Sequence, residues 1–233
     1  MGFDLPYFAS QLFCPSPAFL AGLGVTLGVG IAAELLGFAL ALALVQARLC
    51  RCRPLRAAAA TYVWVLRGTP LLVQIVFLYT GLAAAGLCRF SDISVAGLTL
   101  PGNLQAAVVA LALHEAAYLT EILRAGIQAV PPGQVEAARA LGMRGFTIRR
   151  RIELPQALRA MLPALGNQLS AVLKNTTLVS VIGVSEMLLA TETLNAITFR
   201  TFELYTILAL YFLLIAGACS IMQHAVEQNW RRI

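Results

Sequence analysis

The chain has 233 residues, of which 59% are hydrophobic and only 12% are charged, and its mean hydropathy is +0.79. This composition excludes an ordinary soluble domain and favours a protein that crosses a membrane several times. The net charge of +6 would fit a nucleic-acid partner, but no aromatic residues alternate with the arginines as they do on nucleic-acid-binding surfaces. We therefore expect membrane lipid, and no nucleic acid, around this chain.

Five apolar stretches are long enough to cross the hydrocarbon layer, which takes about 20 residues of helix. In chain order, the expected spans cover residues 19–45, 57–87, 103–128, 162–190 and 202–224. They predict an all-α membrane protein with a single domain, residues 1–233, and no β-sheet. The segment before the first span is expected to lie along the external face of the membrane.

Small residues in the first span suggest close helix packing. They are Gly22, Gly24, Gly28, Gly30 and Gly37. Among them, Gly24 and Gly28 have the four-residue spacing that lets two helix backbones approach each other in lipid. No G-x-x-x-x-G-K-[ST] phosphate-binding loop occurs anywhere in the chain. Any chemistry of ATP and Mg must therefore belong to another chain, and no cofactor is expected in this one.

Basic residues gather in two of the connections between the spans. They are Arg48, Arg51, Arg53 and Arg56 after the first span, and Arg139, Arg144, Arg149, Arg150, Arg151 and Arg159 after the third. Loops rich in arginine and lysine stay in the cytoplasm. With five spans, the N-terminus is then expected outside the membrane and the C-terminus in the cytoplasm.

The connection at residues 130–155 is helical in pattern but too polar to span a membrane. Residues 134–141 favour a short helix, and Gly142 offers the left-handed conformation that ends one. Residues 146–152 are expected to form a second short helix that stops before Pro155. The predicted result is a helix-turn-helix on the cytoplasmic surface.

This connection resembles the EAA loop of ATP-binding-cassette (ABC) importer permeases in every signature position and spacing. The matching residues are Glu136, Ala137, Ala138, Gly142, Ile152, Leu154 and Pro155. In that family the loop is the coupling helix, which docks in a groove of the nucleotide-binding subunit. The resemblance implies that these seven residues couple this chain to a partner ATPase.

A second motif narrows the resemblance. Residues 66–74, Leu-Arg-Gly-Thr-Pro-Leu-Leu-Val-Gln, look like a motif of permeases for histidine, arginine, glutamine, glutamate and opines, and residues 117–126, 166–168 and 174–183 are also similar to that group. The resemblance implies a type I ABC importer transmembrane domain in the bacterial inner membrane. Its implied partners are a second permease subunit, either an identical copy or a close paralogue, an ATPase that holds ATP and Mg, an extracytoplasmic binding protein and a small-molecule amino acid.

Polar residues inside the spans are candidates for the substrate path, because ionisable groups at that depth usually face the bundle interior or water. Glu115 lies about 18 Å from the outer end of its span, near the midplane. Glu121 and Arg124, three apart on one helical face, are instead expected to pair with each other. The full set of path candidates is Arg67, Gln74, Glu115, Lys174, Asn175, Thr176 and Thr177.

Several roles stay open at this stage. Lys174 either lines the path or pairs with Glu34 or Glu115, and Arg67 binds either a substrate carboxylate or a helix end. The role of His114 is also open. A disulfide between the cysteines at positions 14 and 88, which would both lie outside, is a further alternative.

The spans carry a slight acidic excess, which suits a cationic amino acid as substrate. The counted residues are Glu34, Glu115 and Glu186 against Arg67 and Lys174. The two histidines form no H-E-x-x-H motif or other metal-ligand cluster, so the chain is not expected to be an enzyme. We predict a permease subunit that moves polar, cationic amino acids by alternating access; the alternatives are a channel or a membrane-embedded enzyme without an ATPase partner.

Overall fold

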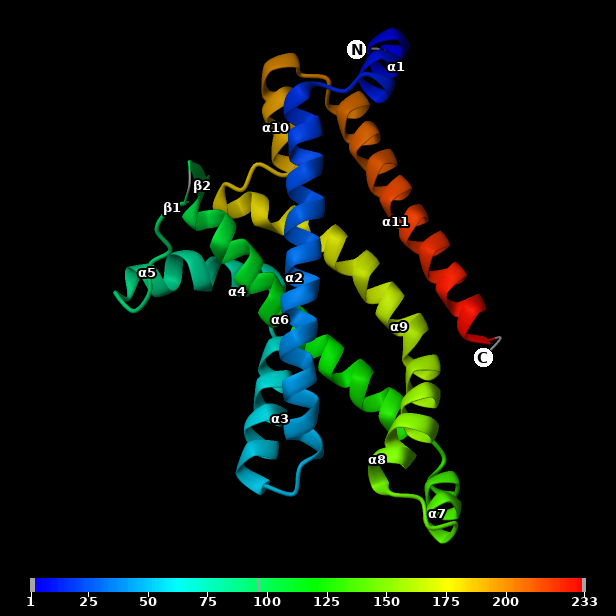
Figure 1. The fold of residues 1–233 in the computed structure, drawn as a ribbon. Coiled ribbons are helices and arrows are strands. Elements are labelled where there is room, and N and C mark those ends of the chain that lie inside the picture. The colour runs from blue at the N-terminus through cyan, green and yellow to red at the C-terminus, as the bar shows by residue number, and fades with distance from the viewer. Residues whose placement is uncertain (1–2, 96, 232–233) are drawn as a thin grey trace.

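The computed structural model describes residues 3–95 and 97–231 of the predicted 1–233 domain. Within this part of the chain, three helices are long and apolar enough to cross a membrane: α2 (Pro17–Leu49), α6 (Gly102–Gln128) and α11 (Thr201–Arg231). Two further helix pairs pass the same test but are bent, so the described residues supply up to five spans. Figure 1 shows α2 and α6 crossing at the centre of the molecule, with α11 along one side.

The second expected span, residues 57–87, is not one straight helix. Its parts are α3 (Arg53–Gly68), α4 (Leu71–Val76), a π-helical turn (Phe77–Gly81) and α5 (Leu82–Ala84). The chain turns by 108° between α3 and the following helices. Pro70 disfavours the helical conformation at Thr69, whose φ and ψ are −113° and 144°.

The side chain of Gln74 stabilises this bend. Its Nε2 donates to the carbonyls of Leu66, at 2.8 Å, and Thr69, at 3.0 Å, and to the Thr69 hydroxyl, at 2.8 Å. These bonds satisfy backbone groups that the end of a helix leaves without partners. The apolar run of the second expected span therefore contains a bend that its own residues stabilise.

The helices in the region of the fourth expected span, residues 162–190, have other bounds than that span. Helix α9 (Leu154–Asn175) begins earlier, and a 3₁₀ segment (Thr176–Ile182) leads to α10 (Met187–Thr198), with a bend of 53° before α10. Gly183, with φ of 77°, turns the chain at the break. The Glu186 carboxylate then accepts from the backbone N–H groups of residues 188 and 189 and caps α10.

A small β-hairpin contradicts the expectation that no sheet would occur. Strands β1 (Ile93–Val95) and β2 (Leu98–Leu100) pair antiparallel just before α6. The hydroxyls of Ser94 and Thr99 lie 3.0 Å apart across the pair, and Gly97, with φ of 82°, supplies the tight turn. Strands of three residues are too short to leave a recognisable pattern in a sequence.

Close helix packing in α2 occurs at three of the five glycines expected to allow it, but not at the Gly24–Gly28 pair. A Cβ on Gly24 or Gly28 would meet nothing within 4 Å among the described residues. At Gly22, Gly30 and Gly37 it would lie 2.9, 2.5 and 2.9 Å from atoms of other elements. The backbone of α2 therefore approaches its neighbours on the face that carries these three glycines.

The segment before α2 forms a short helix, α1 (Leu5–Phe13), that lies beside the start of α11 (Figure 1). Asp4 accepts from the backbone N–H of residue 7 at 3.0 Å and forms an ion pair with Arg200. Cys14, at the end of α1, and Cys88 are both exposed free thiols, so the disulfide considered between them is not formed.

Candidate functional site

The 130–155 loop begins with a short exposed helix, α7 (Pro132–Ala140). Gly142 has φ of 76°, the left-handed conformation expected of it. Its N–H donates to the Arg139 carbonyl at 2.9 Å, and the N–H of Met143 donates to the Ala138 carbonyl at 3.1 Å. This pair of bonds is a Schellman motif, which fixes the direction of the chain after α7.

The sequence predicted that a second short helix would end before Pro155. In the structure, the helical segment continues past this residue. Helix α8 (Gly145–Ile148) runs through a π-helical turn (Arg149–Glu153) directly into α9. Pro155 lies at the second position of α9, just after the π-helical turn, and does not interrupt the helix. The loop is therefore continuous with a long helix of the bundle, without a flexible joint between them.

The seven predicted coupling residues lie together at this end of the molecule. Those exposed are Glu136, Ala137, Gly142 and Leu154; those half-buried are Ile152 and Pro155; and Ala138 is buried. A groove of about 350 Å³ runs between the two halves of the loop. It is lined by Gln134, Ala137, Ala138, Leu141, Met143, Arg151, Ile152 and Gln156.

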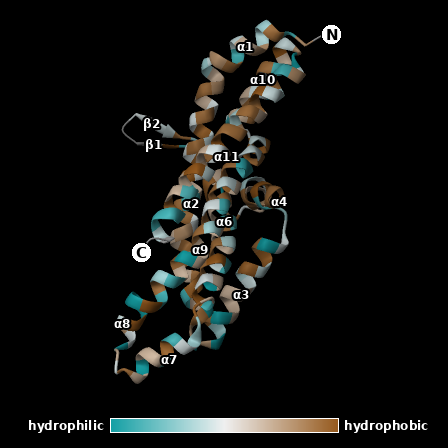
Figure 2. Cartoon of the chain, turned by 90° about the vertical axis from the view of Figure 1, so that its right-hand side faces the viewer, coloured by the Kyte–Doolittle hydropathy of each residue, from teal (hydrophilic) through white to brown (hydrophobic). Residues whose placement is uncertain are grey.

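Two large apolar side chains that the sequence analysis did not single out flank the bend. Leu141 is 82% exposed and Phe146 is 76% exposed. Figure 2 shows hydrophilic and hydrophobic residues mixed along α7 and α8 at this end of the molecule. Large apolar side chains exposed close together are typical of surfaces that bind another protein.

A second group of candidates meets inside the bundle. Glu115 is fully buried in α6, and Gln168 of α9 donates to its Oε2 at 2.5 Å. Asn175 interacts with the same carboxyl, and Glu34 of α2 lies within electrostatic range of it. One oxygen of each carboxyl, Oε1 of Glu115 and Oε2 of Glu34, is buried with no hydrogen-bond partner among the described residues.

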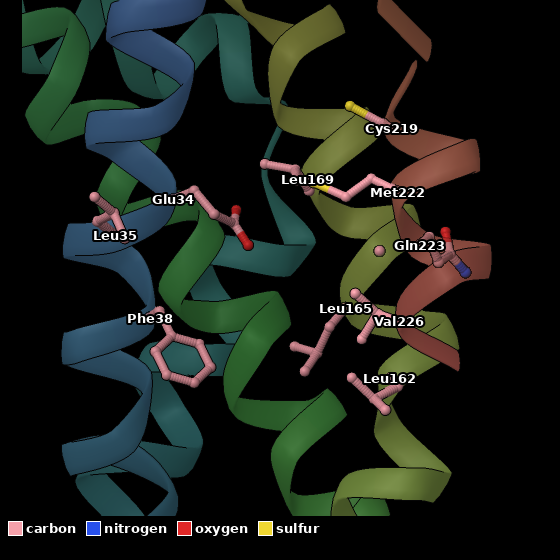
Figure 3. Close-up of a pocket in the computed structure, with 11 residues that line it drawn as sticks. Glu34, Leu35, Phe38, Leu162, Leu165, Leu169, Cys219, Met222, Gln223 and Val226 are labelled. Atoms are coloured by element: carbon pink, nitrogen blue, oxygen red, sulfur yellow. The ribbon is translucent and has the colours of Figure 1, made fainter. Parts of the chain in front are cut away.

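A cavity of about 290 Å³ adjoins Glu34 between α2, α9 and α11. Figure 3 shows the Glu34 carboxylate pointing from α2 toward the space beside Leu169. The lining is otherwise mostly apolar: Leu35, Phe38, Leu162, Leu165, Gly166, Leu169, Cys219, Met222, Gln223 and Val226. Glu34, a residue left without a role by the sequence, is therefore the one charged group in this lining.

Arg67 and Gln74 belong to a different cluster, on the side of α6 that faces the bend of the second span. The Gln74 Oε1 accepts from the His114 Nδ1 at 3.1 Å, because an amide oxygen only accepts. The His114 ring lies 4.9 Å from the Tyr118 ring, and the Arg67 guanidinium lies 5.2 Å from the centre of that same ring. His114, whose role was open, thus connects α6 to the bend.

The remaining path candidates do not converge on Glu115. Lys174 is exposed and, within residues 3–95 and 97–231, forms no ion pair, so the pairing considered with Glu34 or Glu115 is not present. The hydroxyls of Thr176 and Thr177 donate to backbone carbonyls one turn earlier. Both hydroxyls are therefore already engaged within their own helix.

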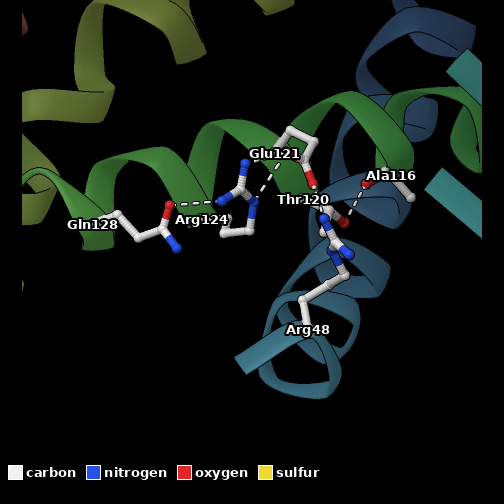
Figure 4. Close-up of polar contacts among 6 residues, drawn as sticks. All are labelled: Arg48, Ala116, Thr120, Glu121, Arg124 and Gln128. Atoms are coloured by element: carbon white, nitrogen blue, oxygen red, sulfur yellow. Dashed lines mark hydrogen bonds and ion pairs between the residues drawn. The ribbon is translucent and has the colours of Figure 1, made fainter. Parts of the chain in front are cut away.

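The expected pair of Glu121 and Arg124 is confirmed, with Arg124 Nη2 at 2.6 Å from Glu121 Oε2. Figure 4 shows a third member, Arg48 of α2, on the other side of the same carboxylate. Arg48 Nη2 lies 3.1 Å from Glu121 Oε1. The sequence carries no signal for this contact, because the two residues are 73 positions apart.

Known proteins similar to this chain are transport permeases. The octopine transport system permease protein OccM of Rhizobium radiobacter is 37% identical over 92% of this chain and 85% of its own length. The arginine transport system permease protein ArgU of Corynebacterium glutamicum is 35% identical over 89% of this chain and 66% of its own. The histidine/lysine/arginine/ornithine transport system permease protein HisM of Salmonella typhimurium is 32% identical over 96% of this chain and 94% of its own.

Solved structures show the same fold. The crystal structure of an amino acid ABC transporter with histidines matches with a TM-score of 0.85 and 35% identity over 98% of this chain and 100% of the matched chain. The MetNI methionine ABC transporter, in an inward-facing conformation, matches with a TM-score of 0.70 and 17% identity, over 98% and 99% of the two chains. Residues 18–232, which are nearly the whole chain, match the model of one protein family. The chain belongs to that family, the binding-protein-dependent transport system inner membrane components.

Proposed function

We propose that this chain is the permease subunit of an ABC importer for cationic amino acids. The relatives named for octopine, nopaline, arginine and the histidine/lysine/arginine/ornithine group support this substrate class. The buried Glu115 and the half-buried Glu34, each with one unpartnered carboxylate oxygen, are suited to a substrate with a positively charged side chain.

The single observation that carries the proposal is the shape of the 130–155 loop. A short helix, a Schellman bend at Gly142 and a continuous helix into the bundle present Leu141 and Phe146 to the outside. A protruding helix that leads into a span without a flexible joint is suited to transmit a push from a soluble subunit. The EAA residues occupy this protruding segment.

The rest of the proposed assembly follows from the family. A second permease subunit completes the path, an extracytoplasmic binding protein delivers the amino acid, and a separate ATPase subunit holds ATP and Mg. The 130–155 loop then lies in the cytoplasm of a bacterium, with the N-terminus of the chain outside and its C-terminus inside. ATP binding and hydrolysis move the two permease subunits between outward-facing and inward-facing states as rigid bodies.

The test is reconstitution of the chain in vesicles with its partner ATPase and binding protein, with labelled arginine, lysine, histidine or glutamine supplied outside the vesicles. Uptake that requires ATP and the binding protein supports the proposal. Uptake without ATP would instead identify a channel, and chemical conversion of the label without transport would identify an enzyme.

A charge reversal on the exposed face of α7 tests the docking surface itself. Glu136→Lys should weaken association with the ATPase, because it reverses the charge of the one carboxylate on that helix. Glu192→Lys, at an exposed position of α10 far from the loop in Figure 1, is the matched control. Unchanged co-purification of the Glu136→Lys chain at moderate salt would argue against docking through α7.

A further inference from the structure

One carboxylate joins the ends of two long helices near the 130–155 loop. Glu121, two turns before the end of α6, accepts from Arg48 in the last turn of α2 through Oε1, at 3.1 Å. Its other oxygen accepts from Arg124, one turn further along α6, at 2.9 Å from Nε and 2.6 Å from Nη2 (Figure 4). Each of the two arginines therefore binds a different oxygen of the Glu121 carboxylate. Of these two contacts, only the one with Arg48 connects α6 to another helix.

The contact between α2 and α6 is partly shielded from solvent. The side chains of Arg48 and Glu121 are 23% and 17% exposed. Among the residues that the structure describes, this is the one side-chain hydrogen bond between the two helices. Since a charged hydrogen bond strengthens as water is excluded, it is suited to hold the helix ends together.

The same helix ends are packed directly onto the loop. One apolar cluster contains Ala41 and Val45 of α2, Leu119 and Leu123 of α6, Val130 at the start of the loop, and Ala157 and Met161 of α9. Gly126 of α6 approaches α9 so closely that a Cβ there would lie 2.7 Å from the Met161 Cε. A displacement of the loop therefore acts first on the end of α6 that carries Glu121.

The groups that must respond to a movement of the loop lie in α6 on the N-terminal side of Glu121. Glu115 is six residues from Glu121, about 9 Å along the helix axis. At the far end, Asn103 donates to the carbonyls of Ile182 and Gly183 at the break before α10, at 3.3 and 2.9 Å. In the middle, His114 connects to Gln74 at the bend of the second span. Helix α6 is thus linked to both bent spans.

We propose that the Arg48–Glu121 contact makes α2 and α6 move as one body, so that Glu121 is a positioning residue that transmits movement of the 130–155 loop to the buried site around Glu115. This rests on the proposed function. The Arg124 contact lies within one helix, so it neutralises Glu121 without linking it to α2.

Two variants separate these roles, because each removes one arginine from the same carboxylate. Arg48→Gln breaks the contact between helices, and Arg124→Gln breaks only the contact within α6. In vesicles with the ATPase and the binding protein, Arg48→Gln should lower the amino acid taken up per ATP hydrolysed by at least about fivefold, a typical coupling between sites. Arg124→Gln should change this ratio by less than about twofold.

A second measurement does not depend on transport. Spin labels are attached at positions 49 and 125, both exposed, in a chain whose five native cysteines have been replaced. They report the distance between the ends of α2 and α6. This distance should be narrowly distributed in the wild type and in Arg124→Gln, and broadened in Arg48→Gln.

The proposal is overturned if both variants change the uptake ratio equally, if neither does, or if Arg48→Gln lowers uptake and ATP hydrolysis in the same proportion. It is also overturned if the label distances stay narrow in Arg48→Gln. A wild-type complex with no ATP-driven uptake would instead refute the proposed function, and the label distances would still decide whether Arg48 and Glu121 join the two helices.

Discussion

Gly37 of α2 lies directly against Glu115 of α6. A Cβ added to Gly37 would be 2.9 Å from the Glu115 Cβ and 3.0 Å from the Ala112 carbonyl oxygen. Because backbone on one side and a buried side chain on the other fill the space, the glycine sets how closely α2 can approach the buried carboxylate.

Gly37→Ala should therefore destabilise the protein by about 1–3 kcal/mol, the usual effect of forcing one extra carbon into a packed interior. Thermal unfolding of the purified chain in detergent measures the change. Gly28→Ala is the matched control, because the same Cβ on α2 would meet nothing within 4 Å. Equal stability of the two variants would mean that α2 can shift away from α6 at little cost.

The straight spans could be predicted from the sequence with good accuracy. The expected spans 19–45 and 103–128 correspond to α2 and α6, since an apolar run of sufficient length directly indicates a spanning helix. Hydropathy could not predict the bends, because it measures the length of an apolar run and carries no direction, although Pro70 is a local sign of the first break. Hydrogen bonds from Gln74 stabilise the bend after Gly68. A hydrogen bond from Asn103, which lies 80 residues away, stabilises the break at Gly183.

The 130–155 loop could be predicted from the sequence, whereas the surroundings of Glu115 could not. The 130–155 loop could be located because its signature is a fixed spacing within 26 consecutive residues. The partners of Glu115 could not, because they come from α2 and α9, at positions 34, 168 and 175. Lys174, the partner suggested by its charge, is exposed instead.

Replacement of Gly142 tests the bend of the loop. Gly142→Asp should abolish transport and leave membrane insertion intact, because the left-handed backbone at φ 76° disfavours a side chain and the added charge lies beside Leu141. Gly133→Asp places the same charge in the first turn of α7, where a Cβ meets nothing within 4 Å, and should be better tolerated. Normal substrate-stimulated ATP hydrolysis in the Gly142→Asp complex would contradict this role.

Gln74 was a candidate for the substrate path, and the structure instead engages its amide in the bend. Gln74→Leu removes the donors to the carbonyls of Leu66 and Thr69 and the acceptor for His114. The chain should lose about 1–3 kcal/mol of stability, as the buried His114 ring and the half-buried Leu66 carbonyl lose their partner, with little change in the KM for the amino acid. A raised KM at unchanged unfolding temperature would restore the substrate role.

The attachment of α1 should survive mild acid. The N–H of Tyr7, and then the guanidinium of Arg200, lower the pKa of Asp4 below its ordinary value of 3.8. A lowered pKa in the folded state contributes stability that is present above the ordinary value and is lost only as the pH falls through the lower one. Protection of the α1 amides from hydrogen exchange, relative to the intrinsic rate at each pH, should therefore be the same at pH 7 and pH 5 and fall below pH 3.8. Asp4→Asn should show fast exchange already at pH 7; protection equal to that of the wild type would mean that the Arg200 pair does not hold α1.

The charge of Glu115 should determine which amino acids the importer prefers. Glu115→Gln keeps the side-chain volume, and its amide oxygen can still accept from Gln168, but the negative charge is lost. Uptake of arginine or lysine should fall by at least about tenfold, which corresponds to ~1.4 kcal/mol of binding free energy. Uptake of glutamine, if the importer carries it, should fall much less, since a neutral side chain needs no counter-charge.

The comparison must exclude a purely structural effect of Glu115, which packs against Gly37 where α2 and α6 meet. Uptake of one cationic and one neutral amino acid is therefore measured in the same vesicles, at matched protein levels, with Glu192→Gln as an exposed carboxylate control on α10. The structural account predicts equal losses for both substrates, because a distorted bundle does not distinguish side-chain charge. Since Lys174 is exposed and forms no ion pair among the described residues, loss of a Lys174 partner cannot produce a selective effect. A uniform loss, or none, would leave the selectivity to groups other than Glu115.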